Sequence, residues 1–286
     1  IRLNIAAFFA KQQNYEMAAT ELLAISADSP AFSTAIGQLV GVLSSVVLDS
    51  KLEATERRQR IERWVQTIRP KLQEDNQWLR QWTLDSKRLA LLLVQLQLES
   101  QDPQAAWIGT LLRIVEQQAP ELNAILRSRF ATVATLSEYH QVSGGTQALD
   151  RLTDLGAEIA AVDLLWLAQS LEQRLPKLGL LGELELAGNN SNRSGMFRRA
   201  ATLQLAVIDS LRTHHTDVAN NHSTWLVQQR ITALLYSDRI AEAIEDAQKA
   251  AEGHEKSLPQ QQWLGYCLAR SNHPADATAA EKQWRK

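Results

Sequence analysis

Apolar residues recur every three or four positions along most of this chain, which is the spacing of an amphipathic α-helix. In residues 52–69, for example, Ile61, Val65 and Ile68 fall on one face, and charged residues occupy the opposite face. No convincing run alternates apolar and polar residues, so no strand is expected. The pattern therefore predicts an all-α protein. The expected helices cover residues 2–12, 15–27, 31–48, 52–69, 76–99, 103–118, 120–140, 146–155, 157–174, 196–213, 225–236, 239–253, 259–270 and 274–285.

The seven prolines fall where these helices are expected to begin or end. Proline fixes φ and lacks an N–H, so it is tolerated in a first helical turn and breaks a helix interior. Their positions therefore agree with the helices predicted from periodicity. They are Pro30, Pro70, Pro103, Pro120, Pro176, Pro259 and Pro274.

A seven-residue motif near the C-terminus occurs twice, 34 residues apart, as Ser237–Ala243 and as Ser271–Ala277. Each copy lies at the turn between two predicted helices. A helix–turn–helix unit at this period is typical of a tetratricopeptide repeat. The motif therefore indicates two stacked helix pairs in this part of the chain.

Because of this repeated motif, residues 225–286 resemble the tetratricopeptide repeat family. The first helix of that repeat carries a small residue, and Gly265 stands at that position, twelve before Ala277 in the second helix. Two residues depart from the pattern. Ile231 occupies the small-residue position of the penultimate repeat, and Glu255 stands where its closing proline would be.

A second match to the family's spacing lies near the N-terminus, where Tyr15, Ala18 and Pro30 occupy family positions. The resemblance implies a right-handed superhelix of antiparallel helix pairs, a tetratricopeptide-like α-solenoid with degenerate repeats. Large apolar residues would fill the space between pairs, and small residues would let helices cross closely.

The only candidate domain boundary is the glycine- and asparagine-rich segment 176–195, which ends in the polar run Asn189–Gly195. Such composition is typical of a loop or hinge. We expect a helical-repeat region over 1–175, the hinge, and tetratricopeptide-like repeats over 196–286. Together these parts would form one continuous solenoid.

Composition narrows the classes of function. The 286 residues include 30 basic and 32 acidic side chains, for a net charge of −2. Nucleic-acid binding usually needs a basic excess, because phosphates must be neutralised, so no nucleic acid is expected. The single cysteine, Cys267, excludes an intrachain disulfide and is expected to be a buried, inert thiol.

The uncharged segment 31–48 raises the question of a membrane span. It contains Gly37 and Gly41 in a GxxxG spacing, but it is slightly short and is interrupted by several serines and threonines. A buried helix whose glycines permit close crossing has the same pattern, so no membrane insertion is expected. The protein is expected to be soluble and, by default, cytoplasmic. The chain begins with Ile instead of Met, so a targeting signal would be out of view.

No catalytic motif is present: there is no phosphate-binding glycine loop, nucleophile elbow, His-Glu-x-x-His or Cys-x-x-Cys. The nearest approach to a metal site is the segment His214–Asp217 with His222 beyond it. Adjacent histidines point in different directions on a helix. We therefore expect no enzyme activity, no cofactor and no metal.

The sequence favours a non-catalytic scaffold that binds a peptide or a partner helix in the concave groove of the solenoid. The candidate contacts are Gln228, Arg230, Gln261 and Gln262, on exposed positions of the first helix in each terminal pair.

Three alternatives remain open. In the first alternative, the chain is a structural or assembly segment that packs against flanking domains of a larger protein. An enzyme would need a deep pocket with clustered carboxylates or histidines. A nucleic-acid binder would need a single basic stripe. That stripe would consist of Arg57, Arg58, Arg60, Arg63, Arg127 and Arg129.

Overall fold

The computed structural model describes residues 1–47, 59, 61–63, 65–66, 83–100, 105–117, 122–139, 146–175, 191–252, 258–271 and 278–280. Every regular element in these residues is a helix and none is a strand, which confirms the all-α prediction. The chain divides into two compact units, Ile1–Ser137 and Glu138–Lys286. The predicted hinge at 176–195 therefore lies inside the second unit.

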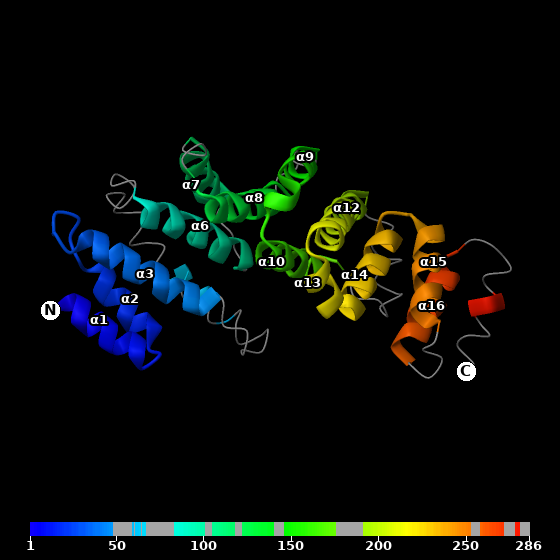
Figure 1. The fold of residues 1–286 in the computed structure, drawn as a ribbon, viewed down its shortest axis with the longest axis horizontal. Helices are drawn as coiled ribbons and strands as arrows, with labels where there is room; N and C mark the ends of the chain where they lie inside the picture. The colour runs from blue at the N-terminus through cyan, green and yellow to red at the C-terminus, as the bar shows by residue number, and fades with distance from the viewer. Residues whose placement is uncertain are drawn as a thin grey trace. The chain divides into compact units, whose positions relative to one another are not determined.

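In the first unit, α1 packs on α2, α2 on α3, α3 on α6, and α6 on α7 (Figure 1). The last helix of the unit, α8, ends just beyond its boundary. Ile61 and Val65 are buried as the periodicity predicted, whereas Ile68 lies outside the described residues. The helices are α1 (Arg2–Lys11), α2 (Tyr15–Leu23), α3 (Phe32–Val47), α6 (Leu84–Glu99), α7 (Ala105–Gln117) and α8 (Ala124–Tyr139).

The uncharged segment forms α3, which packs between α2 and α6. Its buried side chains include Ile36, Leu39 and Leu43, at the i, i+3 and i+7 spacing of one helix face. Its partner α6 is buried on nearly all sides, since every residue from 89 to 98 is buried. Aliphatic burial of this kind is the main favourable term in folding, so the α3–α6 contact is central to the first unit.

Two helices of this unit begin later than predicted. Helix α6 begins at Leu84 instead of residue 76, because Thr83 has an extended backbone and its side chain accepts a hydrogen bond from the Ser86 N–H at 3.2 Å. Helix α8 begins at Ala124 instead of Pro120, and the Asn123 side chain accepts from the Leu126 N–H at 3.0 Å. Both residues satisfy N–H groups that a helix start leaves unpaired.

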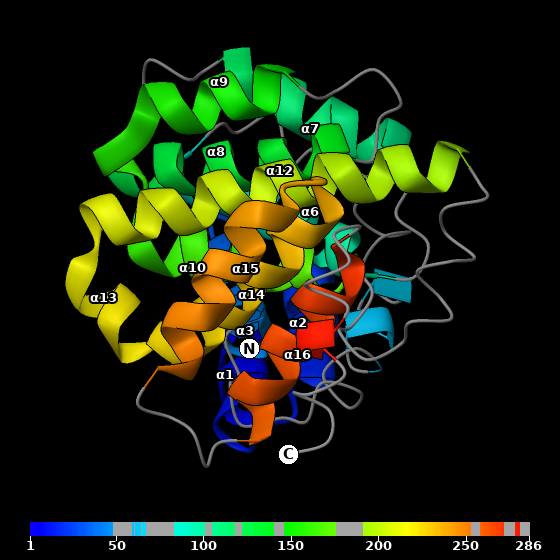
Figure 2. The same cartoon turned by 90° about the vertical axis from the view of Figure 1, so that its right-hand side faces the viewer.

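In the second unit, α12 packs against α10 and α14, α15 packs against α14, and α16 contacts both α14 and α15 (Figure 2). The short helices α9 and α13 and the 3₁₀ turn η2 also pack against α12. The helices are α9 (Thr146–Leu155), η2 (Gly156–Glu158), α10 (Ala161–Glu172), α12 (Ser191–His214), α13 (Thr216–Asn221), α14 (Ser223–Tyr236), α15 (Ile240–Ala251) and α16 (Leu258–Arg270).

Three predictions for this unit were wrong in detail. Helix α12 begins at Ser191, so residues 191–195 of the predicted polar loop are helical; residues 176–190 lie outside the described part. The predicted connection between α12 and α14 contains α13. The single helix predicted over 157–174 is divided at Ile159, whose backbone is extended.

The turns at the two family-like segments have the same backbone geometry. Gln13 ends the α1 segment with φ 59°, and Asp238 ends the α14 segment with φ 63°. In each turn the next residue's N–H reaches back five residues at 2.9 Å, from Asn14 to the Phe9 carbonyl and from Arg239 to Leu234. This is the left-handed helix end of a Schellman-type motif.

The two alanines that the resemblance singles out are both fully buried: Ala18 in α2 and Ala243 in α15. Each lies five residues after the left-handed residue of its turn and one helical turn into the second helix of its pair. The second copy of the C-terminal motif lies outside the described residues from Asn272 onward.

Candidate functional site

The first three helices form a groove of about 450 Å³. Its two sides come from α1 and α3, and α2, which packs against both, contributes Tyr15 and Leu22. The remaining lining residues are Ala6, Ala7, Ala10 and Lys11 of α1, and Gln38, Gly41, Val42 and Ser45 of α3.

Small side chains shape this groove. Three alanines of α1 face a glycine and a serine of α3, so neither helix fills the space between them. A Cβ placed on Gly41 would have no atom within 4 Å. Open space of this kind, lined mainly by apolar atoms with a few polar groups, is typical of a binding site.

The groove also carries groups that can orient a bound segment. Lys11 is an exposed cation in the last turn of α1. Tyr15 and Gln38 supply a hydroxyl and an amide, which can each donate and accept a hydrogen bond. The groove can therefore contact an apolar surface and pair with one carboxylate at its Lys11 end.

Sequence reasoning missed these groove residues, although one signal was available. Gly37 and Gly41 were both interpreted as sites of close helix crossing. That interpretation holds for Gly37, where an added Cβ would lie 3.0 Å from the Asp85 Oδ2 of α6. It is wrong for Gly41, which faces the open groove.

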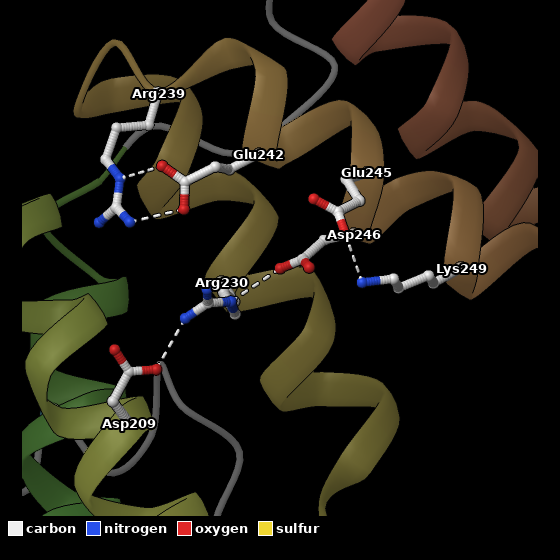
Figure 3. A network of polar contacts seen from close by, with 7 residues as sticks. All are labelled: Asp209, Arg230, Arg239, Glu242, Glu245, Asp246 and Lys249. Atoms are coloured by element: carbon white, nitrogen blue, oxygen red, sulfur yellow. Dashed lines mark hydrogen bonds and ion pairs between the residues drawn. The ribbon is translucent and has the colours of Figure 1, made fainter.

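The structure places Arg230, a predicted partner contact, inside an ion-pair network that joins three helices (Figure 3). Its Nε donates to Asp246 Oδ2 of α15 at 2.7 Å, and its Nη1 donates to Asp209 Oδ1 of α12, also at 2.7 Å. The Arg230 side chain is only 18% exposed. Its guanidinium thus ties α12, α14 and α15 together.

Two further ion pairs, one of them formed by the residue that precedes α15, involve carboxylates of α15 in the same view (Figure 3). Arg239 donates to both carboxylate oxygens of Glu242, at 2.7 and 2.6 Å, and Lys249 donates to Glu245 at 2.6 Å. The hydrogen bonds from Arg239 lower the pKa of Glu242, and Glu242 raises that of Arg239. Both pairs are exposed, so they contribute little to stability.

The other predicted contacts lie on two helices that touch each other, α14 and α16. Gln228 is half-buried in α14, Gln261 is half-buried in α16, and Gln262 is exposed. The structure brings their helices together, and their role in partner binding stays a prediction.

The histidine segment forms structural contacts. The Nε2 atom of His215 lies 2.8 Å from the carbonyl oxygen of Ile159, within hydrogen-bond distance, and the His222 ring packs edge-on against Trp225. Trp225 also donates to Glu172 at 3.1 Å. Among the described residues, no three His, Cys, Asp or Glu side chains cluster closely enough to hold a metal ion.

The single thiol is buried in α16, as predicted. Burial raises the pKa of Cys267 to about 12, and the nearby Asp246 carboxylate adds to the effect. A thiol with so high a pKa is almost entirely protonated at neutral pH and is a poor nucleophile.

Half of the hypothetical basic stripe falls outside the described residues, at Arg57, Arg58 and Arg60. Of the rest, Arg63 lies 3.8 Å from Glu16, and Arg129 donates to the Gln95 amide at 3.0 Å. Within the described part of the chain, no helix is both long enough and apolar enough to cross a membrane.

The chain matches no protein-family model, and no curated protein or solved structure is significantly similar to it. The resemblance to tetratricopeptide repeats therefore rests on the spacing of its residues and stays a prediction.

Proposed function

We propose that this chain is a non-catalytic interaction module that holds a helix of a partner protein in the groove between α1 and α3. The open space beside Gly41 carries the proposal. Glycine in a helix interior costs about 1 kcal/mol relative to alanine, and Gly41 lines the groove together with the small side chains of α1. A partner helix that needs this space explains why no side chain fills it.

The arrangement of helices supports the same function. Shared turns at Gln13 and Asp238, each followed by a buried alanine, are what repeated helix pairs would produce. We extend this to a degenerate, tetratricopeptide-like superhelix. Stacked pairs of this kind bind partners along the surface formed by their first helices, which are α1 and α3 in the groove.

The chemistry of the groove defines the partner segment. Alanines and a glycine accept the apolar face of a helix at close distance. Lys11 favours a partner with a carboxylate near one end of that face, and Tyr15 and Gln38 provide hydrogen bonds at its edge. We therefore expect an amphipathic helix with an acidic residue beside small or aliphatic ones.

The test compares two glycines. Gly41 and Gly109 are both helical, and an added Cβ meets no atom within 4 Å at either, but only Gly41 lines the groove. Immobilised wild-type chain, G41L and G109L would each be exposed to lysate of the source organism, and retained proteins would be quantified by mass spectrometry. A saturable set that G41L loses and G109L retains supports the proposal. Equal retention by G41L would overturn it.

A second candidate, a structural segment of a larger assembly, is favoured by one observation. Ile5 and Phe8 lie one turn apart on α1 and are 37% and 56% exposed. Exposed apolar stripes usually pack against another surface. If this candidate is correct, the isolated chain should self-associate or lose stability, and I5K/F8K should relieve self-association. A stable monomer in analytical ultracentrifugation would contradict it.

A further inference from the structure

Helix α12 of the second unit carries a polar side chain in the middle of its buried face. Ala200, Gln204 and Ile208 follow the i, i+4 and i+8 spacing of one helix face, and all three are fully buried. Helix α12 packs against α10 and α14 (Figure 2). Gln204 therefore places an amide where the pattern of the face favours an aliphatic side chain.

This amide is not hydrogen-bonded. In the part of the chain that the structure describes, neither Oε1 nor Nε2 of Gln204 has a partner, and the buried Oγ of Ser210, also on α12, has none. A buried amide loses its hydrogen bonds to water, and nothing replaces them here. The docked position of α12 is therefore destabilised by its own polar atoms.

A second buried glutamine in the same unit is paired. Gln229 of α14 donates through Nε2 to Glu172 Oε1 of α10 at 2.6 Å, and Trp225 of α14 donates to Glu172 Oε2 at 3.1 Å. Glu172 thus joins α10 directly to α14. The two helices against which α12 packs are connected to each other without it.

The ion pairs of Arg230 have the same bias (Figure 3). The Asp246 side chain, which ties α14 to α15, is 23% exposed, whereas that of Asp209, which ties α14 to α12, is 58% exposed. Water and salt weaken the more exposed pair more strongly. Arg230 therefore holds α12 less firmly than it holds α15.

The C-terminal end of α12 has the geometry of a hinge. His215 separates α12 from α13 with a non-helical backbone, φ −135° and ψ 53°. Its Nε2 lies 2.8 Å from the carbonyl oxygen of Ile159, which precedes α10. Residues at the ends of elements usually absorb the backbone rotation of a hinge motion. An anchored, non-helical residue at this point allows α12 to move while its end stays in place.

We infer that α12 undocks reversibly from the second unit by rotating about His215, while α10, α14 and α15 stay joined. Undocking returns the Gln204 amide to water, which offsets part of the apolar contact that is lost and lowers the free energy of the open state. A molecule that bound the uncovered apolar face would shift the equilibrium toward this state. The inference concerns the second unit and does not depend on the groove between α1 and α3.

Hydrogen exchange of the intact chain, resolved by residue and repeated at low urea concentrations, tests whether α12 opens alone. Backbone amides of α12 around Gln204 are expected to exchange at least about tenfold faster than those of α14 around Gln229, with a weaker dependence on urea. Equal protection of the two helices with equal urea dependence would show that α12 opens only in global unfolding, and would overturn the inference.

The same substitution at the two buried glutamines provides the matched comparison. Methionine is apolar and of similar length. Q204M removes an unpaired amide, so it should slow exchange of the α12 amides about tenfold and raise Tm. Unchanged or faster exchange of these amides in Q204M would overturn the role of Gln204.

Q229M instead breaks a hydrogen bond that the open state keeps. It should lower Tm and speed exchange of the α14 amides about tenfold, but change exchange of the α12 amides by less than about twofold. Circular dichroism melts establish that both variants are folded. Equal acceleration in α12 and α14 would show that the Glu172 bridge does not survive the opening, and would overturn the separate movement of α12.

Discussion

Gln13 and Asp238, near opposite ends of the chain, have the same left-handed backbone, with φ 59° and 63°. Each turn is followed by a helix whose fully buried alanine, Ala18 or Ala243, lies five residues later. Left-handed backbone strains residues that have a Cβ, and aspartate tolerates it better than glutamine. The same local conformation is thus imposed on two different residues.

Glycine at these turns should stabilise the protein. Q13G is expected to raise the free energy of unfolding by about 0.5–1 kcal/mol, and D238G by less, because strain is relieved in the folded state. Urea denaturation of wild type and both variants measures these changes in the free energy of unfolding. Q13A, which retains the Cβ, serves as the control, and a loss of stability in Q13G would contradict the account.

The two glycines of α3 should respond differently to substitution. G41A is expected to stabilise the protein by about 0.5–1 kcal/mol, since alanine favours helix and its Cβ enters open space. G37A should gain less, because its Cβ would lie 3.0 Å from Asp85 Oδ2 and that side chain must move. G37L should be destabilised by overpacking. Thermal melts of the three variants test the predicted order of stability, with G41A highest and G37L lowest. A larger gain in G37A than in G41A would contradict the prediction.

Replacing Arg230 should destabilise the second unit. R230M removes hydrogen bonds to Asp246 and Asp209 and leaves the partly buried Asp246, whose side chain is 23% exposed, without this partner. We expect a loss of about 1–3 kcal/mol.

The matched control for Arg230 is K249M, which breaks an exposed pair with Glu245 and should cost less than about 0.5 kcal/mol. Chemical denaturation of both variants compares the two losses. Equal losses would show that Arg230 does not act as a tie between helices. If R230M instead weakens partner capture without changing stability, its predicted role as a contact regains support.

Cys267 provides a prediction about pH. Its pKa is raised to about 12 in the folded protein from an ordinary value of 9.0, so the folded state holds a proton that the unfolded state releases between these values. Stability due to this thiol is therefore complete below pH 9 and falls as pH rises toward 12, by at most about 1.4 kcal/mol per pH unit.

The corresponding measurement is the unfolding free energy of wild type minus that of C267A. This difference should fall as pH rises above 9. Iodoacetamide should modify the thiol slowly in the native protein and rapidly in urea. Rapid native modification at pH 8 would contradict the burial of this group.

The sequence predicted the helices well where apolar periodicity is strong. Ile61 and Val65 were assigned to one apolar face of the helix expected over 52–69, and both are buried. The helix starts at Leu84 and Ala124 were misplaced, because Thr83 and Asn123 interrupt a pattern whose periodicity continues across them.

The sites were harder to predict, for two physical reasons. The Arg230 network joins positions 209, 230 and 246, and no local pattern pairs charges on three separate helices. A groove is a place where side chains are missing, so Gly41 has the same sequence signal as Gly37 although one faces open space and the other faces Asp85.

Helix α3 lies between the groove beside Gly41 and a second groove on its other side, where it meets α6 and α8, and this position has a consequence for how the chain can change over generations. Val40 and Ser44 serve one surface, and their immediate neighbours Gly41 and Ser45 serve the other. Because successive residues on a helix point about 100° apart, a substitution at one codon alters a single surface. Two surfaces encoded in the same short stretch of gene can therefore change separately, while the buried third face of the helix keeps the fold in place.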